Sequence, residues 1–142
     1  MTDRAADDLG RFLPEQDRAY SAALAELRRG RKTGHWMWFI FPQIAGLGSS
    51  AMAQRYAIRS LDEALAYLGD PVLGARLREA SEAVLASTAR TAVDIFGPTD
   101  AKKLRSSMTL FHRAAPDDPV FVRVLDRFFG GVADPLTDAR LR

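Results

Sequence analysis

The chain has 142 residues, a length that predicts one domain over 1–142. It carries 20 Lys and Arg and 18 Asp and Glu, which gives a formal net charge of +2. Its hydrophobic residues make up 47% and its charged residues 27% of the chain, and both values are typical of a globular protein. This composition excludes a disordered polyelectrolyte, a coiled coil and a collagen-like chain. Because there is no cysteine and only two histidines, we expect no disulfide, no metal site and no cofactor.

Location and large partners are constrained by hydropathy and charge. No stretch approaches the roughly 18 apolar residues of a membrane span, and the acidic N-terminus lacks the apolar core of a signal peptide. We therefore expect a cytoplasmic protein without a membrane partner. The basic cluster Arg28, Arg29, Arg31 and Lys32 is typical of a helix C-terminus, where cations favour the helix dipole. A nucleic-acid contact is the weaker interpretation, since charge runs are usually solvated. Whether the protein has a protein partner stays open.

The first elements in chain order are a helix and an apolar run. Pro14 opens a helical pattern that should end at Gly30 or Gly34. Residues 36–41 are all apolar and are followed by Pro42, and periodicity alone does not separate a buried strand from a buried helix there. A lone strand would leave two unpaired edges inside the protein, and no second strand candidate exists. We therefore predict a buried helix.

The rest of the chain reads as helices separated by proline and glycine. Ser60 begins a capping-box pattern, and Asp-Pro pairs at 70–71, 118–119 and 134–135 supply an N-cap followed by proline at the first helical position. The predicted helices cover 51–57, 61–68, 71–86, 92–96, 100–113 and 119–129. Gly74 is the one glycine that falls inside a predicted helix. The pattern predicts an all-α domain of about six to eight mostly short helices.

The glycine-rich stretch after the apolar run invites a nucleotide-binding interpretation. Gly46-x-Gly48-x-x-Ala51 formally matches the dinucleotide fingerprint, but the second strand that the fingerprint requires is missing, and no Walker lysine follows. Both of those folds are therefore excluded. Two glycines with Ser49 and Ser50 still lead into a helix N-terminus, where free amides and hydroxyls can hold an anion. A flexible loop capped by Ser50 is an equally weighted alternative.

The first concentration of chemistry is His35-Trp36-Met37-Trp38, which holds both tryptophans. Large aromatic side chains mainly fill protein interiors, so we assign one tryptophan to the core and leave the other open as a stacking surface for a flat ligand. His35 and Gln43 would supply polar contacts. If a reaction is catalysed, His35 is the candidate acid or base, because imidazole exchanges a proton near neutral pH.

The second concentration runs from Lys103 to His112 and includes Ser106 and Ser107. On a helix, Lys103 and Ser107 are four residues apart and share a side, and a Ser–Lys pair can act as nucleophile and base. A serine inside a helix far more often bonds its own i−4 carbonyl, and neither oxyanion donors nor a third catalytic member is visible. The catalytic residues, and whether there is catalysis at all, therefore stay open.

Three strings together resemble one known family. They are Gly34-His-Trp-Met-Trp-Phe-Ile-Phe-Pro-Gln43, Gly46-Leu-Gly-Ser-Ser50 and Lys103-Leu-Arg-Ser-Ser-Met-Thr-Leu-Phe111. The chain is similar, over roughly residues 9–131, to the domain of unknown function 1810 family of short bacterial and some fungal proteins. The resemblance implies a compact all-helical domain, and it carries over neither an activity nor catalytic residues. Some members are labelled calpastatin, but calpastatin repeats are disordered, whereas this composition is globular.

Two hypotheses of different classes follow. The first is a small-ligand pocket where the 35–50 and 103–107 segments meet. Lys103 and the loop amides would hold an anionic group such as phosphate, and Trp36 or Trp38 would stack on a base-like ring. Its ligand-binding candidates are Trp36, Trp38, Gln43, Gly46, Gly48, Ser49, Ser50, Lys103, Ser106 and Ser107. Convergence of His35, Gln43, Ser49 and Lys103 on one cavity would support it.

The second hypothesis is a protein-interaction or regulatory helical module without catalysis. It is motivated by the absence of a visible catalytic triad, carboxylate pair or metal cluster. It predicts an exposed apolar patch of several hundred Å², around Phe128, Phe129 or the tryptophan segment.

Overall fold

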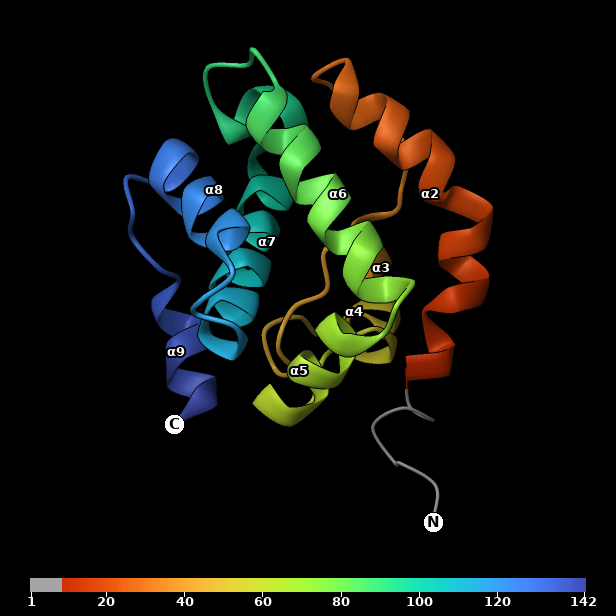
Figure 1. The fold of residues 1–142 in the computed structure, drawn as a ribbon, viewed down its shortest axis with the longest axis vertical. Helices are drawn as coiled ribbons and strands as arrows, with labels where there is room; N and C mark the ends of the chain where they lie inside the picture. Colours follow the sequence, from red (N-terminus) through yellow and green to blue (C-terminus); the bar gives the residue numbers. More distant parts are fainter. Residues whose placement is uncertain (1–8) are drawn as a thin grey trace.

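Helices follow one another along residues 9–142, the part of the chain that the structure, a computed structural model, describes (Figure 1). Their bounds are η1 (a 3-10 helix) Leu9–Arg11, α2 Leu13–Arg28, α3 Met37–Ile40, α4 Ala51–Arg55, α5 Leu61–Gly69, α6 Leu73–Ala86, α7 Ala92–Ala114, α8 Pro119–Phe129 and α9 Pro135–Leu141. Over this range the only β pairing is an isolated bridge between Ile44 and Ile58. The prediction of an all-α domain of six to eight helices is confirmed.

The longer helices pack around one another (Figure 1). α6 packs against α2, α5 and α8, and α7 packs against α5, α8 and α9. This arrangement brings the start of α9 beside α7, although about 30 residues of chain separate α9 from the middle of α7. None of the helices within residues 9–142 is both long and apolar enough to cross a membrane.

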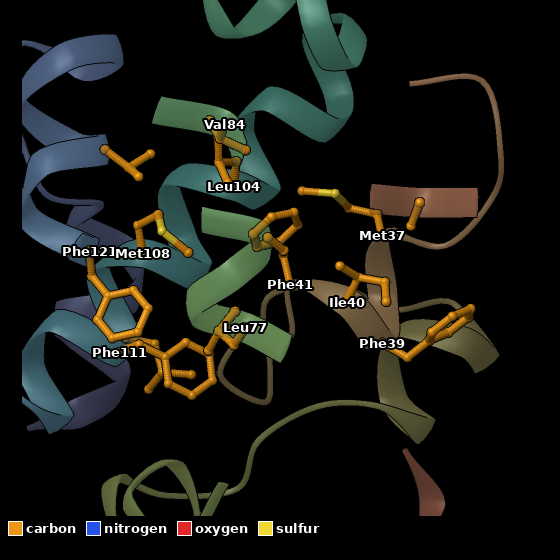
Figure 2. Close-up of a cluster of buried hydrophobic side chains, with 14 of the residues drawn as sticks. Met37, Phe39, Ile40, Phe41, Leu77, Val84, Leu104, Met108, Phe111 and Phe121 are labelled. Atoms are coloured by element: carbon orange, nitrogen blue, oxygen red, sulfur yellow. The ribbon is translucent and has the colours of Figure 1, made fainter. Parts of the chain in front are cut away.

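The core lies where α3, α6, α7 and α8 meet, and Figure 2 shows the side chains that fill it. Met37, Ile40 and Phe41 approach the facing stripes of α6 and α7 and are at most 2% exposed. The predicted core stripes of α6 and α7 are buried as expected: Leu73, Leu77, Ala80, Val84, Leu104, Met108 and Phe111. Each large apolar side chain buried this fully contributes about 1.5–3 kcal/mol relative to an exposed one.

The helix N-termini largely follow the predicted caps. Ser50, Ser60 and Asp118 each accept a hydrogen bond from a backbone amide in the first turn of their helix. The helix predicted from residue 71 begins instead at Leu73. Asp70 Oδ1 accepts both the Val72 and the Leu73 amides at 2.9 Å, so Asp70 caps a turn that precedes the helix.

The apolar run and the segments around Gly97 differ most from the predicted helices. The apolar run is helical and buried, but α3 is a single turn that ends before Phe41, because a residue followed by proline is disfavoured in the helical region. Phe41 accordingly has φ −125° and ψ 73°. The segments predicted as 92–96 and 100–113 are joined in α7, and Gly97 breaks the helical geometry between them with φ 79° and ψ 166°.

Of the two glycines predicted to end the first long helix, Gly30 is the one at which α2 ends. Gly30 has φ +79°, its amide bonds the Leu27 carbonyl, and the Arg31 amide bonds the Glu26 carbonyl, the pairing of a Schellman end. The basic cluster therefore lies at a helix C-terminus. Its last member, Lys32, turns inward and pairs with Asp100 Oδ2 at 2.8 Å, with 8% of its side chain exposed.

Candidate functional site

A hollow of about 520 Å³ lies between the 43–50 loop, α4, the middle of α7 and the turn that begins α9; we call it the α7 hollow. Its volume falls within the range of small-molecule sites in proteins. The predicted site residues that line it are Trp38, Gln43, Gly48, Ser49, Ser50, Lys103 and Ser106. The hollow is therefore lined by residues of both segments, 35–50 and 103–107, that the first hypothesis places around one pocket.

Trp38 and Lys103 form one wall of the α7 hollow. In the single turn of α3, Met37, Phe39 and Ile40 are buried while Trp38 remains half-buried and lines the hollow. Lys103 Nζ lies 5.1 Å from the centroid of the Trp38 ring, within the range of a cation–π contact. Asp100 Oδ1 holds the same ammonium at 3.3 Å, so the lysine has an acidic partner beside the aromatic one.

The opposite wall is the glycine-rich loop, which two backbone hydrogen bonds hold in place. The Ala45 amide donates to the Ile58 carbonyl and the Ile58 amide donates to the Gln43 carbonyl, both at 2.8 Å. Ser50 caps the five-residue α4 by accepting the Ala53 amide at 3.1 Å. The Ser49 side chain is exposed at the rim. The loop is thus fixed at both ends.

Two lining residues of the α7 hollow, Ser106 and Asp134, belong to a buried polar network. Asp134 Oδ2 accepts the Ser106 hydroxyl at 2.8 Å, the Thr137 hydroxyl at 2.5 Å and the Thr137 amide at 3.2 Å. The Asp134 amide donates in turn to Thr109 Oγ1 at 2.9 Å. Arg105 donates to the carbonyls of Val132 and Ala133, both at 2.9 Å. These bonds attach the segment before α9 to α7.

The charge of the lining is positive. It contains the cations Lys102, Lys103 and Arg105 and the carboxylate Asp134, which gives a net charge of +2. The Arg105 guanidinium already donates hydrogen bonds to two backbone carbonyls. Lys102 is exposed and makes no ion pair within residues 9–142. The α7 hollow can therefore offer ammonium groups to an anion at its mouth.

Four candidates do not line the α7 hollow. His35 is exposed in the turn before α3, so it lies apart from Gln43, Ser49 and Lys103, with which it was expected to converge. Trp36 is 2% exposed and donates its indole N–H to Glu26 Oε1 at 3.1 Å, which makes it the tryptophan of the core. Trp38 is the one that lines the hollow.

Gly46 and Ser107 have other surroundings. Gly46 has φ +97°, its carbonyl accepts Arg140 at 3.2 Å, and a Cβ there would lie 2.6 Å from the Arg140 guanidinium carbon. Glycine is therefore favoured here by the positive φ, whereas the close Arg140 atoms are at the end of a flexible side chain that can move. Ser107 is fully buried, and its hydroxyl has no hydrogen-bond partner in the described part of the chain. It faces the interior, so it does not share an accessible side with Lys103.

Half of the residues that line the hollow were not candidates from the sequence. The additional residues are Leu47, Ala53, Thr99, Lys102, Arg105, Asp134 and Leu136. The one local signal for Lys102 is its position directly before the candidate Lys103. Asp134 was interpreted as a helix cap, which it is, and no sequence spacing relates it to Ser106, 28 residues earlier.

The second hypothesis concerned Phe128, Phe129 and the tryptophan segment. Both phenylalanines are half-buried and pack against the core, and the Arg127 guanidinium lies 4.5 Å from the Phe128 ring centroid.

Comparison with known proteins places the chain in a family. No curated protein matches it. A crystal structure of the conserved hypothetical protein Rv1873 from Mycobacterium tuberculosis matches it with 51% sequence identity and a TM-score of 0.93, covering 94% of this chain and 96% of that one. The model of the family described as protein of unknown function (DUF1810) matches residues 6–141. The chain therefore belongs to the DUF1810 family.

Proposed function

We propose that the protein binds a small molecule with a planar ring and an anionic group such as phosphate in the α7 hollow. The observation that carries this proposal is the position of Lys103 beside the Trp38 ring, at 5.1 Å, in the wall of a hollow of about 520 Å³. An aromatic face and an ammonium group in one concave surface match the two halves of a nucleotide-like ligand.

The ring would lie against Trp38. This side chain is half-buried and packs against the core, so part of its indole lies open to the hollow. Stacking of a base on an aromatic side chain contributes about 1–3 kcal/mol. A side chain that is already packed loses less conformational entropy on binding than a fully exposed one.

The anionic group would lie at the mouth, near Lys102, Lys103 and Ser49. Lys103 shares its charge with Asp100, while Lys102 is free of ion pairs within residues 9–142. The Ser49 hydroxyl on the opposite wall can donate a further hydrogen bond. The net charge of +2 favours a ligand of low negative charge, and salt should weaken its binding.

Titration calorimetry with adenosine 5′-monophosphate at low ionic strength tests the proposal. We expect saturable binding to the wild-type protein, and Trp38→Ala should weaken it about tenfold through lost stacking. Lys103→Met should weaken binding by a similar factor, and added salt should reduce the difference between this variant and the wild type. Arg90→Met, which removes an exposed cation outside the α7 hollow, is the matched control and should bind like the wild type.

The outcome of this titration is decisive in two ways. Absence of saturable binding would refute the proposal for nucleotide-like ligands. Binding that Trp38→Ala and Lys103→Met leave unchanged would place the ligand elsewhere on the protein and refute this site.

A further inference from the structure

We propose that the free oxygen of Asp134 makes the α7 hollow selective for ligands that carry a hydroxyl group, such as the ribose of a ribonucleotide. The inference rests on the proposed function and adds to it the part of the ligand that lies between ring and anion. It assigns to Asp134 a role in selecting the ligand beyond its role in capping α9.

The two carboxylate oxygens of Asp134 have different surroundings. Oδ2 accepts three hydrogen bonds, two from Thr137 and one from Ser106. These bonds come from α9 and α7, so they fix the carboxylate between two elements of the fold. The side chain therefore cannot rotate without breaking this network.

The other oxygen, Oδ1, forms no hydrogen bond with any residue from 9 to 142. Asp134 as a whole is 8% exposed, and the residue lines the α7 hollow. Oδ1 is also absent from the buried side-chain atoms without a partner, so it retains contact with solvent. Asp134, a lining residue of the hollow, thus carries one carboxylate oxygen without a partner in residues 9–142, on a side chain that the other oxygen holds in place.

An unpaired carboxylate oxygen accepts hydrogen bonds and donates none. It attracts hydroxyl groups and repels a second anion, so the anionic group of the ligand should stay near Lys102 and Lys103. A neutral, hydroxyl-bearing part should then lie toward Asp134. A site with an unpaired polar group binds an analogue that lacks the matching hydroxyl less tightly, because the group stays unsatisfied.

The probe pair is adenosine 5′-monophosphate and its 2′,3′-dideoxy analogue, titrated against the wild-type protein and Asp134→Asn. Asparagine caps a helix as well as aspartate does, and its amide oxygen can accept the Ser106 and Thr137 bonds. Its NH₂ group would then replace Oδ1, so the free acceptor becomes a donor and the negative charge disappears.

We expect the wild-type protein to bind the ribonucleotide about tenfold more tightly than the dideoxy analogue, the usual size of one lost hydrogen bond to a charged group. Asp134→Asn should reduce this preference to about threefold or less, because its amide N–H donates to the hydroxyl in a neutral bond that replaces one to a charged oxygen. It should bind the dideoxy analogue at least as tightly as the wild type does. Damage to the fold would instead weaken both ligands. Asp70→Asn, a cap that does not line the hollow, should keep the wild-type preference.

Several outcomes would overturn the inference. Equal binding of both nucleotides to the wild-type protein would refute selection by Asp134 and leave the proposed function standing. An undiminished preference in Asp134→Asn would assign the selectivity to another group. Equal weakening of both nucleotides would show that Asp134 has a structural role alone. Binding of neither nucleotide would remove the proposed function and this inference together.

Discussion

Replacement of Glu26 by alanine is expected to destabilise the protein strongly. Glu26 is 7% exposed, and its Oε1 accepts the amides of Thr33 and Gly34 at 2.6 and 2.7 Å and the Trp36 indole at 3.1 Å. This one oxygen holds the end of α2 against the segment that leads into α3. Alanine would leave three donors without a partner, and one of them is on a buried tryptophan.

The size of the effect follows from these contacts. A hydrogen bond to a charged group contributes about 1.5–3 kcal/mol, and such bonds at one atom are not additive. A buried donor left without its acceptor costs about 1–3 kcal/mol, so the loss of all three bonds to Glu26 corresponds to about 3–5 kcal/mol. We expect Glu26→Ala to lie in that range, a large part of a total stability of about 5–15 kcal/mol. Glu26→Gln keeps an acceptor oxygen and should lose about 1–2 kcal/mol.

The same contacts predict a pH dependence. Burial would raise the pKa of Glu26, but the hydrogen bonds from Gly34, Thr33 and Trp36 together outweigh it and lower the pKa below 4.5. Because the folded pKa is below the unfolded one, the ionised carboxylate stabilises the fold at neutral pH. This contribution is lost as the pH falls below about 4.5 toward the folded pKa.

Urea denaturation of the wild type, Glu26→Ala and Glu26→Gln checks both expectations, with unfolding followed by tryptophan fluorescence and circular dichroism. The difference in unfolding free energy between wild type and Glu26→Gln should shrink as the pH falls from about 6 to about 3. A loss of less than about 1 kcal/mol for Glu26→Ala, or a difference that does not change with pH, would refute the reasoning.

Two further predictions concern packing and burial. Gly74→Ala should lower the unfolding free energy, measured by urea denaturation, by about 2–3 kcal/mol, because its Cβ would lie 2.2 Å from the Leu68 carbonyl oxygen. As a control, the Cβ of Gly69→Ala would meet no atom within 4 Å, so this variant should change the unfolding free energy by less than about 0.5 kcal/mol. Similar losses for both would contradict this packing argument. Burial raises the pKa of Tyr67 above its ordinary value of 10.0, and burial together with the Glu79 hydrogen bond raises the pKa of Tyr20 in the same way. The protonated phenols therefore stabilise the fold below about pH 10, and this contribution is lost as the pH rises toward their folded pKa values. In a spectrophotometric titration two of the three tyrosines should ionise only above the ordinary phenol range, and ionisation of all three near pH 10 in the folded protein would contradict the assignment.

Sequence reasoning succeeded where the physical cause is local. Ser60 and Gly30 act on amides and carbonyls within a few residues, so their capping roles are visible in a short window. The core stripes of α6 and α7 follow from helical periodicity in the same way. Gly74 is a case that local patterns do not explain. The sequence shows a glycine inside a helix, but it does not show the Leu68 carbonyl oxygen that leaves no room for a side chain there.

The residues of the α7 hollow were partly predictable for the same reason. Polar and aromatic residues are concentrated in two short strings, and both strings contribute residues to the lining of the hollow. Which side chain of a string faces the hollow depends on the packing of its helix: Ser106 lines it while its neighbour Ser107 is buried in the core. The same holds for Trp38 and Trp36, which are two residues apart in the turn that leads into and forms α3.

The sequence by itself therefore determined the all-α class, most of the helix bounds and the two segments that meet at the candidate site. Only the tertiary structure decided which residues of those segments are accessible, and that His35 lies outside the α7 hollow. It also brought Asp134 to Ser106 through the packing of α9 on α7. The physical reason is that caps and periodicity act over a few residues, whereas a hollow is formed by contacts between segments far apart in the chain, which no local pattern encodes.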